Sequence, residues 1–196
     1  MNTVKSPTLS AGTSDRRFST RDLVLAGMFA AVMTVISQIS LPMPTGVPIT
    51  IQVFGVALIG VVLGWRLGVF SLLVYVLLGA VGLPVFANFH GGFSSLVGLT
   101  GGYIWSWPIM AAFCGIEPPF KNQKTSFAVR ILLALIGLAI VETVGGLQWA
   151  ALSADMGVKA VFLYSIVGFV PKDILITVLA VVIGLSIRKS IRGIAK

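Results

Sequence analysis

The chain has 196 residues, of which 57% are apolar and only 10% are charged. Soluble domains are about half apolar and about a quarter charged, so this composition excludes an ordinary soluble domain and predicts an all-α membrane protein. The net charge of +8 would be compatible with nucleic-acid binding if the basic residues formed one patch.

The basic residues fall instead in alternate connections between the apolar segments. One set of connections contains Lys5, Arg16, Arg17, Arg21, Arg66, Lys121, Lys124, Arg130, Arg188, Lys189, Arg192 and Lys196, and only Lys159 and Lys172 lie in the other set. This is the positive-inside pattern of six membrane spans with both termini in the cytoplasm. We therefore expect contact with membrane lipid and no nucleic-acid partner.

The two ends of the chain differ from its apolar middle. Residues 1–21 are rich in Ser, Thr and Arg, which predicts a disordered cytoplasmic tail. The apolar run over residues 23–41 is longer than the core of a signal peptide, so we expect it to remain as the first span. Residues 22–190 form the expected six-helix transmembrane domain, followed by a basic cytoplasmic tail over residues 191–196.

The first span carries small residues at helical spacing. Ala26 and Ala30 lie four residues apart, with Gly27 and Ala31 beside them. Small residues at this spacing allow another helix to approach closely within a membrane. The pattern fits either a face that docks another subunit or internal packing against a neighbouring span.

The remaining elements follow from the apolar runs. Residues 42–50 contain three prolines and predict a stiff, uncharged outer loop. Further spans are expected at residues 51–64, 67–82, 101–115 and 127–147, and the sixth from Pro171 to just before Arg188. Residues 148–165 are mixed in character and predict an outer loop or a helix at the interface. No internal repeat supports an inverted-repeat carrier.

The stretch over residues 84–103 is polar and rich in glycine although it lies between apolar segments. It includes Asn88, His90, Gly92 and Ser94, whose groups would be costly if they faced lipid. Irregular backbone at membrane depth is tolerated only when it is buried in protein or lines a cavity. The stretch therefore predicts a small-molecule site inside the bundle.

Three ionisable residues are expected at membrane depth: Glu142, Lys172 and Asp173. Such residues are candidates for function because burying them is costly. Asp173 follows Pro171 in the first turn of the expected last helix, where an acid can simply cap the helix. Alternatively, the helix start and Lys172 together offer an anion site to a ligand carboxylate.

Other chemistry finds little support in the chain. His90 is the single histidine and Cys114 the single cysteine, too few for a metal site or a disulfide. Ser94 near His90 suggests a rhomboid-type intramembrane protease, but the nucleophile lacks its following glycine and no zinc, phosphate-loop or dinucleotide motif is present. We expect no enzyme, no metal and no cofactor. Trp149 fits an interfacial anchor or a ligand contact equally.

Several motifs resemble the BioY family, the biotin-binding S components of energy-coupling factor (ECF) transporters. They are Pro48-Ile49-Thr50-Ile51-Gln52, Leu63-Gly64, Tyr75, Leu78-Gly79-Ala80-Val81-Gly82-Leu83-Pro84-Val85-Phe86-Ala87, Gly91-Gly92 and Thr100-Gly101-Gly102-Tyr103. The resemblance covers most of residues 22–190. It implies the six-helix S-component fold, with an outward-facing pocket roofed by the first outer loop.

The resemblance also implies partners and site residues. It matches Ala26 and Ala30 to the face that docks the transmembrane T subunit, which couples S components to a pair of ATPases. It matches Asp173 to the family's acid near the start of the last helix and Asn88 to the polar residue after Val-Phe. The family's lysine one turn after the acid is replaced here by Ile176, and a tyrosine common in the family is replaced by Glu142.

These correspondences lead to a hypothesis for biotin. Asn88 and Asp173 bind the ureido group, and Lys172 lies on or near the carboxylate. The residues around the ring are Gln52, Tyr103 and Trp149, with Gly92 among the glycines that permit close backbone approach. The alternatives are an S component for another small vitamin and a solo biotin facilitator that needs no ATPase.

Overall fold

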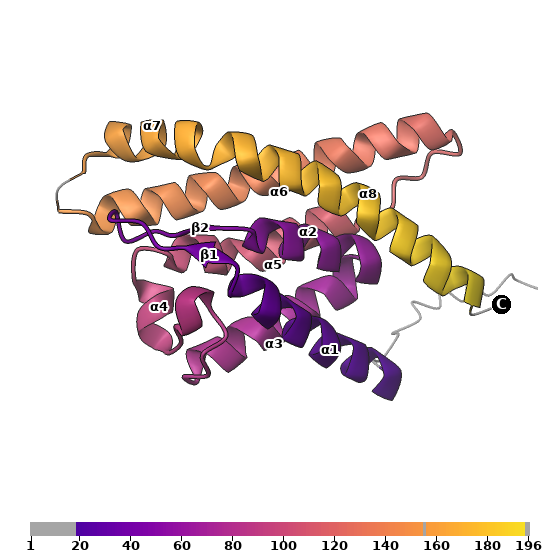
Figure 1. The fold of residues 1–196 in the computed structure, drawn as a ribbon. Helices are drawn as coiled ribbons and strands as arrows, with labels where there is room; N and C mark the ends of the chain where they lie inside the picture. The colour runs from indigo at the N-terminus through magenta and orange to yellow at the C-terminus, as the bar shows by residue number, and fades with distance from the viewer. Residues whose placement is uncertain (1–18, 155, 195–196) are drawn as a thin grey trace, which may run out of the picture.

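A computed structural model describes residues 19–154 and 156–194, with side chains up to residue 190, as a bundle of α-helices (Figure 1). The expected tail over residues 1–21 lies outside this part of the chain except for its last three residues. Helix α1 begins at Thr20, because the Ser19 side chain accepts from the Asp22 N–H and Asp22 accepts from the Ser19 N–H, a capping box. The elements are α1 (Thr20–Ser37), β1 (Ser40–Leu41), β2 (Ile49–Thr50), α2 (Gln52–Leu63), α3 (Trp65–Ala80), the 3₁₀ turn η1 (Ala87–Phe89), α4 (Phe93–Val97), α5 (Gly101–Gly115), α6 (Gln123–Leu152), α7 (Val158–Gly168) and α8 (Val170–Ile194).

The helices present an apolar outer surface. Val35 on α1, Val167 on α7 and Leu175 on α8 are 68%, 72% and 69% exposed. Soluble monomers rarely leave so much apolar surface open, so lipid is the environment that fits it. By length and composition, α1, α6 and residues 170–190 of α8 can each cross a membrane, whereas α2, α3 and α7 are apolar but shorter.

Helix α2 forms the centre of the bundle, packed against α8, α5, α3 and α1. Ten of its 12 residues are buried, and at 1.5 Å per residue it is only about 18 Å long. Close packing depends on Gly60, because a Cβ there would lie 2.5 Å from the Ala111 carbonyl oxygen of α5. Helix α2 is therefore a short central helix that the other helices surround.

Helix α1 packs on α3 through the alanines of the small-residue pattern. Ala26 and Ala30 are each 1% exposed, and the Ser71 hydroxyl of α3 donates to the Ala26 carbonyl at 2.8 Å. The structure therefore shows internal packing at these two positions. Gly27 and Ala31, one residue further along, are the small pair on the exposed side of α1.

Residues 148–165, expected as an outer loop or a helix at the interface, are largely helical. Helix α6 continues to Leu152, and α7 then runs from Val158 to within one residue of α8. Only residues 153–157 connect α6 to α7, and Asp155 lies outside the described residues. Helix α6 continues past its expected end although the local sequence is mixed in character. The reason is that Trp149 is fully buried against α7, and this burial stabilises the added turns.

The start of α8 also differs from the expected free helix end. The Asp173 N–H donates to the Phe169 carbonyl at 2.9 Å, and the Phe169 N–H donates to Ser165. Helices α7 and α8 therefore form one interrupted helix, with Pro171 just after the break. The Asp173 amide is not available to cap an anion, and α8 continues to Ile194 where a separate tail was expected from residue 191.

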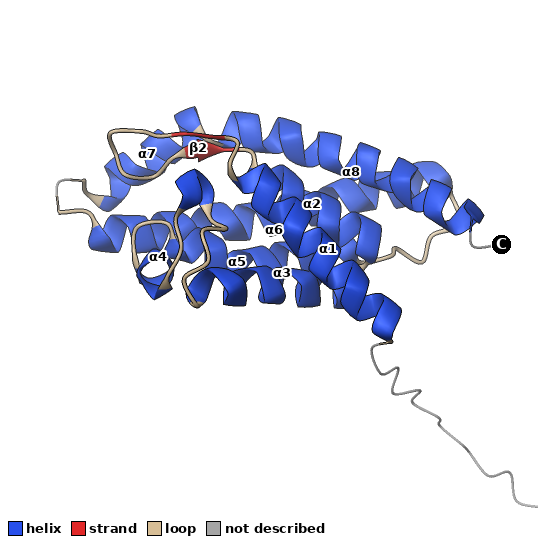
Figure 2. Cartoon of the chain, turned by 60° about the horizontal axis from the view of Figure 1, so that its bottom comes forward, coloured by secondary structure: helices blue, strands red, loops and turns tan. Residues whose placement is uncertain are grey.

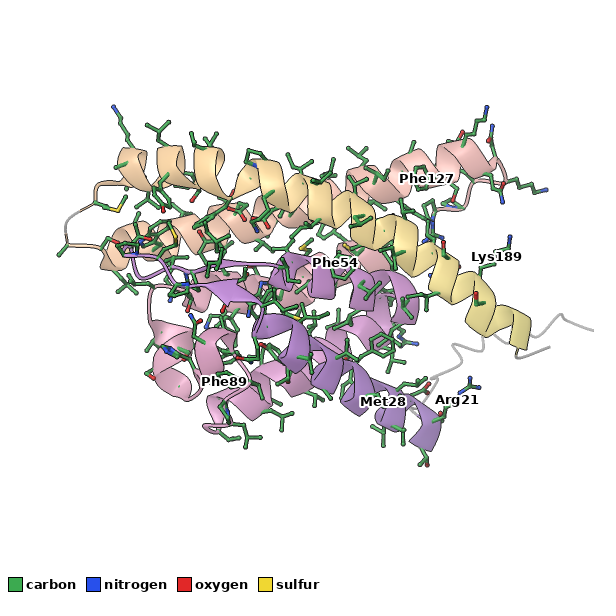
Figure 3. All side chains as sticks on the ribbon, viewed as in Figure 1. Arg21, Met28, Phe54, Phe89, Phe127 and Lys189 are labelled. Atoms are coloured by element: carbon green, nitrogen blue, oxygen red, sulfur yellow. The ribbon has the colours of Figure 1, made fainter. Side chains whose placement is uncertain are left out.

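The two ends of the bundle have different character. The start of α1 and the end of α8 lie at the same end, where Arg21 and Lys189 project (Figures 1 and 3). Arg188 connects α8 to two other parts of this end. It forms an ion pair with Glu117, which precedes α6, and donates to the Val61 carbonyl of α2 at 3.2 Å. The β1–β2 hairpin and α4 lie toward the other end (Figure 2).

Candidate small-molecule site

A cavity with about 850 Å³ of empty space, including the space open at its mouth, lies at the hairpin end of the bundle. Its lining comes from the first loop and hairpin, from α2, η1, α5 and α6, and from the α7–α8 junction: Gly46, Val47, Pro48, Thr50, Gln52, Val53, Phe86, Ala87, Asn88, His90, Ser95, Thr100, Tyr103, Ile104, Trp107, Glu142, Phe169, Lys172 and Asp173. Buried side chains in this lining include those of Val53, Phe86, Ile104, Trp107, Phe169 and Asp173, whereas Asn88 and His90 are exposed.

The loop over residues 42–48 covers one side of the cavity and is anchored at its tip. Val47 is 4% exposed and packs with Trp149 of α6, Val161 of α7 and Phe169. The rings of Trp149 and Phe169 lie 6.1 Å apart between centroids. Trp149 thus lies behind the cavity wall and supports the loop.

The rim of the cavity holds Asn88 in a fixed, left-handed backbone conformation. Asn88 has φ 56° and ψ 35°, a region that asparagine tolerates better than most residues. Its side-chain oxygen accepts from the Ser40 hydroxyl at 2.7 Å, and the Gln38 side chain bonds the backbone of Phe86 and Phe89. With the oxygen thus oriented, the amide N–H groups of Asn88 are the part of the side chain left to donate to a ligand.

Lys172 and Asp173 connect α8 to the roof. The Lys172 ammonium lies 2.5 Å from an Asp173 carboxylate oxygen and donates to the Thr50 carbonyl of β2 at 2.6 Å. The Asp173 side chain is 5% exposed and that of Lys172 is 28% exposed. A buried carboxylate with a single cationic partner retains acceptor capacity, so Asp173 can accept from the N–H groups of a ligand.

A second polar group faces the cavity from α5 and α6. The Tyr103 hydroxyl and one Glu142 carboxylate oxygen are buried, and no described residue gives either a hydrogen bond of ordinary length. Ser165 of α7 and the Glu142 carboxylate lie around the Tyr103 hydroxyl. Unsatisfied buried polar atoms are costly, so these atoms are suited to meet a polar ligand.

Tyr103 is placed by a close contact between α5 and α6. A Cβ on Gly145 would lie 2.3 Å from the Tyr103 ring, so only glycine leaves room for the ring there. A Cβ on Gly102 would likewise lie 2.5 Å from the Val144 carbonyl oxygen. The glycines of the Thr-Gly-Gly-Tyr motif therefore bring the two helices together and direct Tyr103 toward the cavity.

The floor of the cavity rests on a buried hydrogen-bond network. The Tyr75 hydroxyl of α3 lies 2.7 Å from the Ser37 hydroxyl of α1 and donates to the Val85 carbonyl at 2.8 Å. Gln52, 7% exposed at the start of α2, lies beside Tyr75. The Tyr75 ring packs 5.6 Å from Phe86 and 6.0 Å from Trp107, measured between centroids. This network holds the aromatic floor in place.

The structure brings five of the seven predicted binding residues to one cavity: Gln52, Asn88, Tyr103, Lys172 and Asp173. Gly92 and Trp149 do not line it. Gly92 bonds the Gly79 carbonyl through its N–H at 2.7 Å, and Trp149 lies in the supporting cluster.

Sequence reasoning missed Thr50, Phe86, Trp107 and Phe169 as lining residues. Phe86 stands in the Leu-Pro-Val-Phe motif, so a signal was present for it. Trp107 could not be told from Trp105, because both are aromatic positions of one apolar helix. The structure separates them: Trp107 is 3% exposed and Trp105 is 50% exposed.

The chain is similar to known proteins along most of its length. The sequence model of the BioY family matches residues 9–193. The probable biotin transporter BioY of Pyrococcus horikoshii is 38% identical over 163 residues, which cover 83% of this chain and 93% of that protein. The biotin transporter BioY of Thermotoga maritima is 40% identical over 172 residues, covering 86% and 96%.

A solved structure has the same fold. The crystal structure of the S-component for biotin from an ECF-type ABC transporter superposes with a TM-score of 0.73 and 25% sequence identity. The match covers 86% of this chain and 91% of that chain. The similarity therefore extends over most of the helical bundle.

Proposed function

Because the chain belongs to the BioY family, we propose that it takes up biotin as the substrate-binding membrane subunit of an ECF-type transporter. The members of this family with which it aligns are transporters, in agreement with the expectation that the chain is not an enzyme. The relatives are named for biotin transport, and the proposal assigns that function to this chain.

The observation that carries the proposal is the pairing of Asn88 and Asp173 in one aromatic-floored cavity. Biotin has a ureido group with two N–H donors and one carbonyl acceptor, fused to an apolar bicycle. Asp173 accepts from the ureido N–H groups, and the Asn88 amide donates to the ureido carbonyl. Trp107 and Phe86 give the bicycle an apolar floor, and Tyr103 and Gln52 lie around it.

The proposed topology has six spans with both termini in the cytoplasm. The spans are α1, α2, α3, α5, α6 and the interrupted α7–α8 helix. The common end of α1 and α8 carries Arg21 and Lys189 (Figure 3). Arg188 precedes Lys189 in α8, and these basic residues support a cytoplasmic location by the positive-inside rule. The cavity then opens toward the outside of the cell membrane, where biotin is captured.

The proposed partners are the T component and the ATPase subunits of an ECF transporter. The predicted docking through Ala26 and Ala30 requires α1 to part from α3, because both alanines are buried. Gly27 and Ala31 have the same spacing on the exposed side and can meet a partner helix without that change. We therefore place the docking surface at Gly27 and Ala31.

Purification of the full chain in detergent from cells grown with biotin tests the proposed ligand. Mass spectrometry of the released small molecules should identify biotin, and calorimetric titration of ligand-free protein should give saturable biotin binding. A different vitamin in the extract, with no biotin binding, would contradict the proposal. Uptake that persists in cells lacking all energising subunits would instead identify a solo facilitator.

A further inference from the structure

The β1–β2 hairpin is linked to both side chains proposed to bind the ureido group. On strand β1, the Ser40 hydroxyl donates to the side-chain oxygen of Asn88 at 2.7 Å. On strand β2, the Thr50 carbonyl accepts from the Lys172 ammonium at 2.6 Å, and that ammonium also lies 2.5 Å from an Asp173 carboxylate oxygen. The hairpin therefore reaches Asn88 directly and Asp173 through Lys172.

Ser40 and Thr50 lie opposite each other in this hairpin, as one of its cross-strand pairs. Beside them, the Ile51 N–H donates to the Ile39 carbonyl at 3.4 Å. The Ser40–Thr50 pair is therefore of the kind that makes no hydrogen bonds between its own backbone groups, in which the two side chains come closest. The Thr50 carbonyl consequently points away from β1 and is available to Lys172.

The hairpin is held in place independently of a ligand. The loop between its strands contains three prolines, which restrict the backbone. Val47 in this loop is 4% exposed and packs with Trp149 and Phe169. The Thr50 hydroxyl accepts from the Gln52 N–H at 3.3 Å, which joins β2 to the start of α2. The hairpin can therefore serve as a rigid reference for the side chains that it contacts.

The Asn88 side chain depends on this reference because its other surroundings restrict it little. The residue is exposed, and within the described part of the chain its side chain has one hydrogen-bond partner, the Ser40 hydroxyl. Fixing a side chain before the ligand arrives lowers the entropy cost of binding. Part of the affinity gained through the Asn88 amide should therefore depend on Ser40.

We propose that the β1–β2 hairpin positions Asn88 and Asp173 for a ligand that carries a carbonyl acceptor between two N–H donors, with Ser40 as the positioning residue for Asn88. Ser40 holds the amide oxygen, so the N–H groups of Asn88 are left for the ligand carbonyl. Lys172, held on Thr50, occupies one oxygen of Asp173 and leaves the other to accept from the ligand N–H groups. The inference rests on the proposed function, in which biotin supplies the ureido group.

A double-mutant cycle on biotin affinity tests the role of Ser40. The full chain is purified in detergent and titrated with biotin as wild type, Ser40→Ala, Asn88→Gly and the double variant. Ser40→Ala should weaken binding about fivefold, the equivalent of about 1 kcal/mol for one neutral hydrogen bond. In Asn88→Gly, where glycine keeps the left-handed backbone, adding Ser40→Ala should change nothing further.

Three further variants separate positioning from folding. Ser40→Thr keeps the hydroxyl and should retain wild-type affinity, whereas Ser40→Val has the same shape without the hydroxyl and should bind as weakly as Ser40→Ala. Ser186→Ala removes an exposed hydroxyl that bonds the Val182 carbonyl of its own helix, and it should leave affinity unchanged. Size-exclusion and thermal unfolding profiles establish that each variant is folded.

The link through the hairpin is tested in Lys172→Met. With the anchor at Thr50 released, adding Ser40→Ala should cost less than twofold instead of about fivefold, because the hairpin no longer holds Asn88 rigidly. Hydrogen exchange of the ligand-free protein is a second measurement and decides alone if this variant binds too weakly to titrate. The Ile51 N–H should exchange faster in Lys172→Met than in wild type.

The outcomes distinguish this inference from the proposed function. Equal biotin affinity of the threonine and valine variants at Ser40, or an undiminished loss from Ser40→Ala in Asn88→Gly, overturns the positioning role while biotin still binds. An undiminished loss from Ser40→Ala in Lys172→Met, or unchanged exchange of the Ile51 N–H, overturns the link between the two sides. Failure of folded wild-type protein to bind biotin removes the proposed function itself.

Discussion

At the scale of single residues, Asp173 combines two tasks. Its side chain is 5% exposed, and its ionic partner among the described residues is Lys172, which also bonds the Thr50 carbonyl of the roof. The carboxylate therefore offers acceptor capacity to the cavity while it orients the ammonium toward the loop. Asn88 faces the same cavity from a left-handed turn fixed by Ser40.

Asp173→Asn keeps the shape of the side chain and removes its charge. Hydrogen bonds to charged groups are worth about 1.5–3 kcal/mol, so biotin affinity should fall by about 10- to 150-fold. Calorimetric titration of the purified variant measures the change. The control Asp22→Asn removes an acid at the far end of α1 and should leave affinity unaltered. Wild-type affinity in folded Asp173→Asn would rule out its contact with biotin.

At the scale of elements, glycines decide how closely the helices approach. Gly145 accepts the Tyr103 ring, whereas its neighbour Gly146 would place a Cβ at an ordinary 3.4 Å from Phe162. The adjacent glycines of α6 therefore tolerate alanine very differently. The two pairs of small residues in α1 should also differ in their tolerance of larger side chains. Ala26 and Ala30 face α3, whereas Gly27 and Ala31 face outward.

Gly145→Ala should displace Tyr103, because the new methyl group would lie 2.3 Å from its ring. We expect weaker biotin binding and a loss of about 1–3 kcal/mol of stability from overpacking. The matched variant Gly146→Ala should retain binding and be neutral or more stable, since alanine favours a helix by about 1 kcal/mol. Thermal unfolding and titration of both proteins give the comparison; equal behaviour of the two would contradict the packing argument.

The two faces of α1 can be separated by a pair of double variants. Gly27→Leu with Ala31→Leu should preserve folding and biotin binding, because an added Cβ at Gly27 meets nothing within 4 Å and Ala31 is exposed. It should strongly reduce uptake in cells that supply the energising subunits. Ala26→Leu with Ala30→Leu should destabilise the protein itself by forcing α1 from α3. Normal uptake by the first variant would remove Gly27 and Ala31 from the docking surface.

At the scale of the whole molecule, the cavity joins parts that are distant in sequence. Its lining combines the roof after α1, the rim before α4, the inner faces of α5 and α6, and the junction of α7 with α8. A ligand that contacts all of them links the two sides of the bundle. Ligand binding and global stability should therefore be coupled.

Biotin at about 100 times its Kd should stabilise the folded protein by about 2.7 kcal/mol, as expected for a ligand that binds only the native state. The measurement is thermal unfolding in detergent with increasing biotin. A vitamin that lacks the ureido ring should leave the unfolding temperature unchanged. Stabilisation by both compounds to the same extent would argue against a specific site.

Much of the architecture follows from local sequence, but the inward faces do not. Apolar runs and basic connections predict the helices, and Asn88, Lys172 and Asp173 are noticeable as polar groups among apolar neighbours. Trp149 was ambiguous because an aromatic residue near a helix end fits an anchor or a ligand contact equally. The structure assigns it to the cluster beneath Val47.

The sequence by itself determined the helical, membrane-type character of the chain, the polar stretch over residues 84–103 and most of the candidate ligand contacts. The first two depend on composition and spacing, and the contacts depend on the resemblance of the motifs to the BioY family. Only the tertiary structure decided that Ala26 and Ala30 pack inward, that α7 continues nearly unbroken into α8, and that Glu142 shares a cavity with Lys172 and Asp173. The reason is physical: hydropathy indicates that a helix is buried in an apolar medium, but lipid and protein interior are equally apolar.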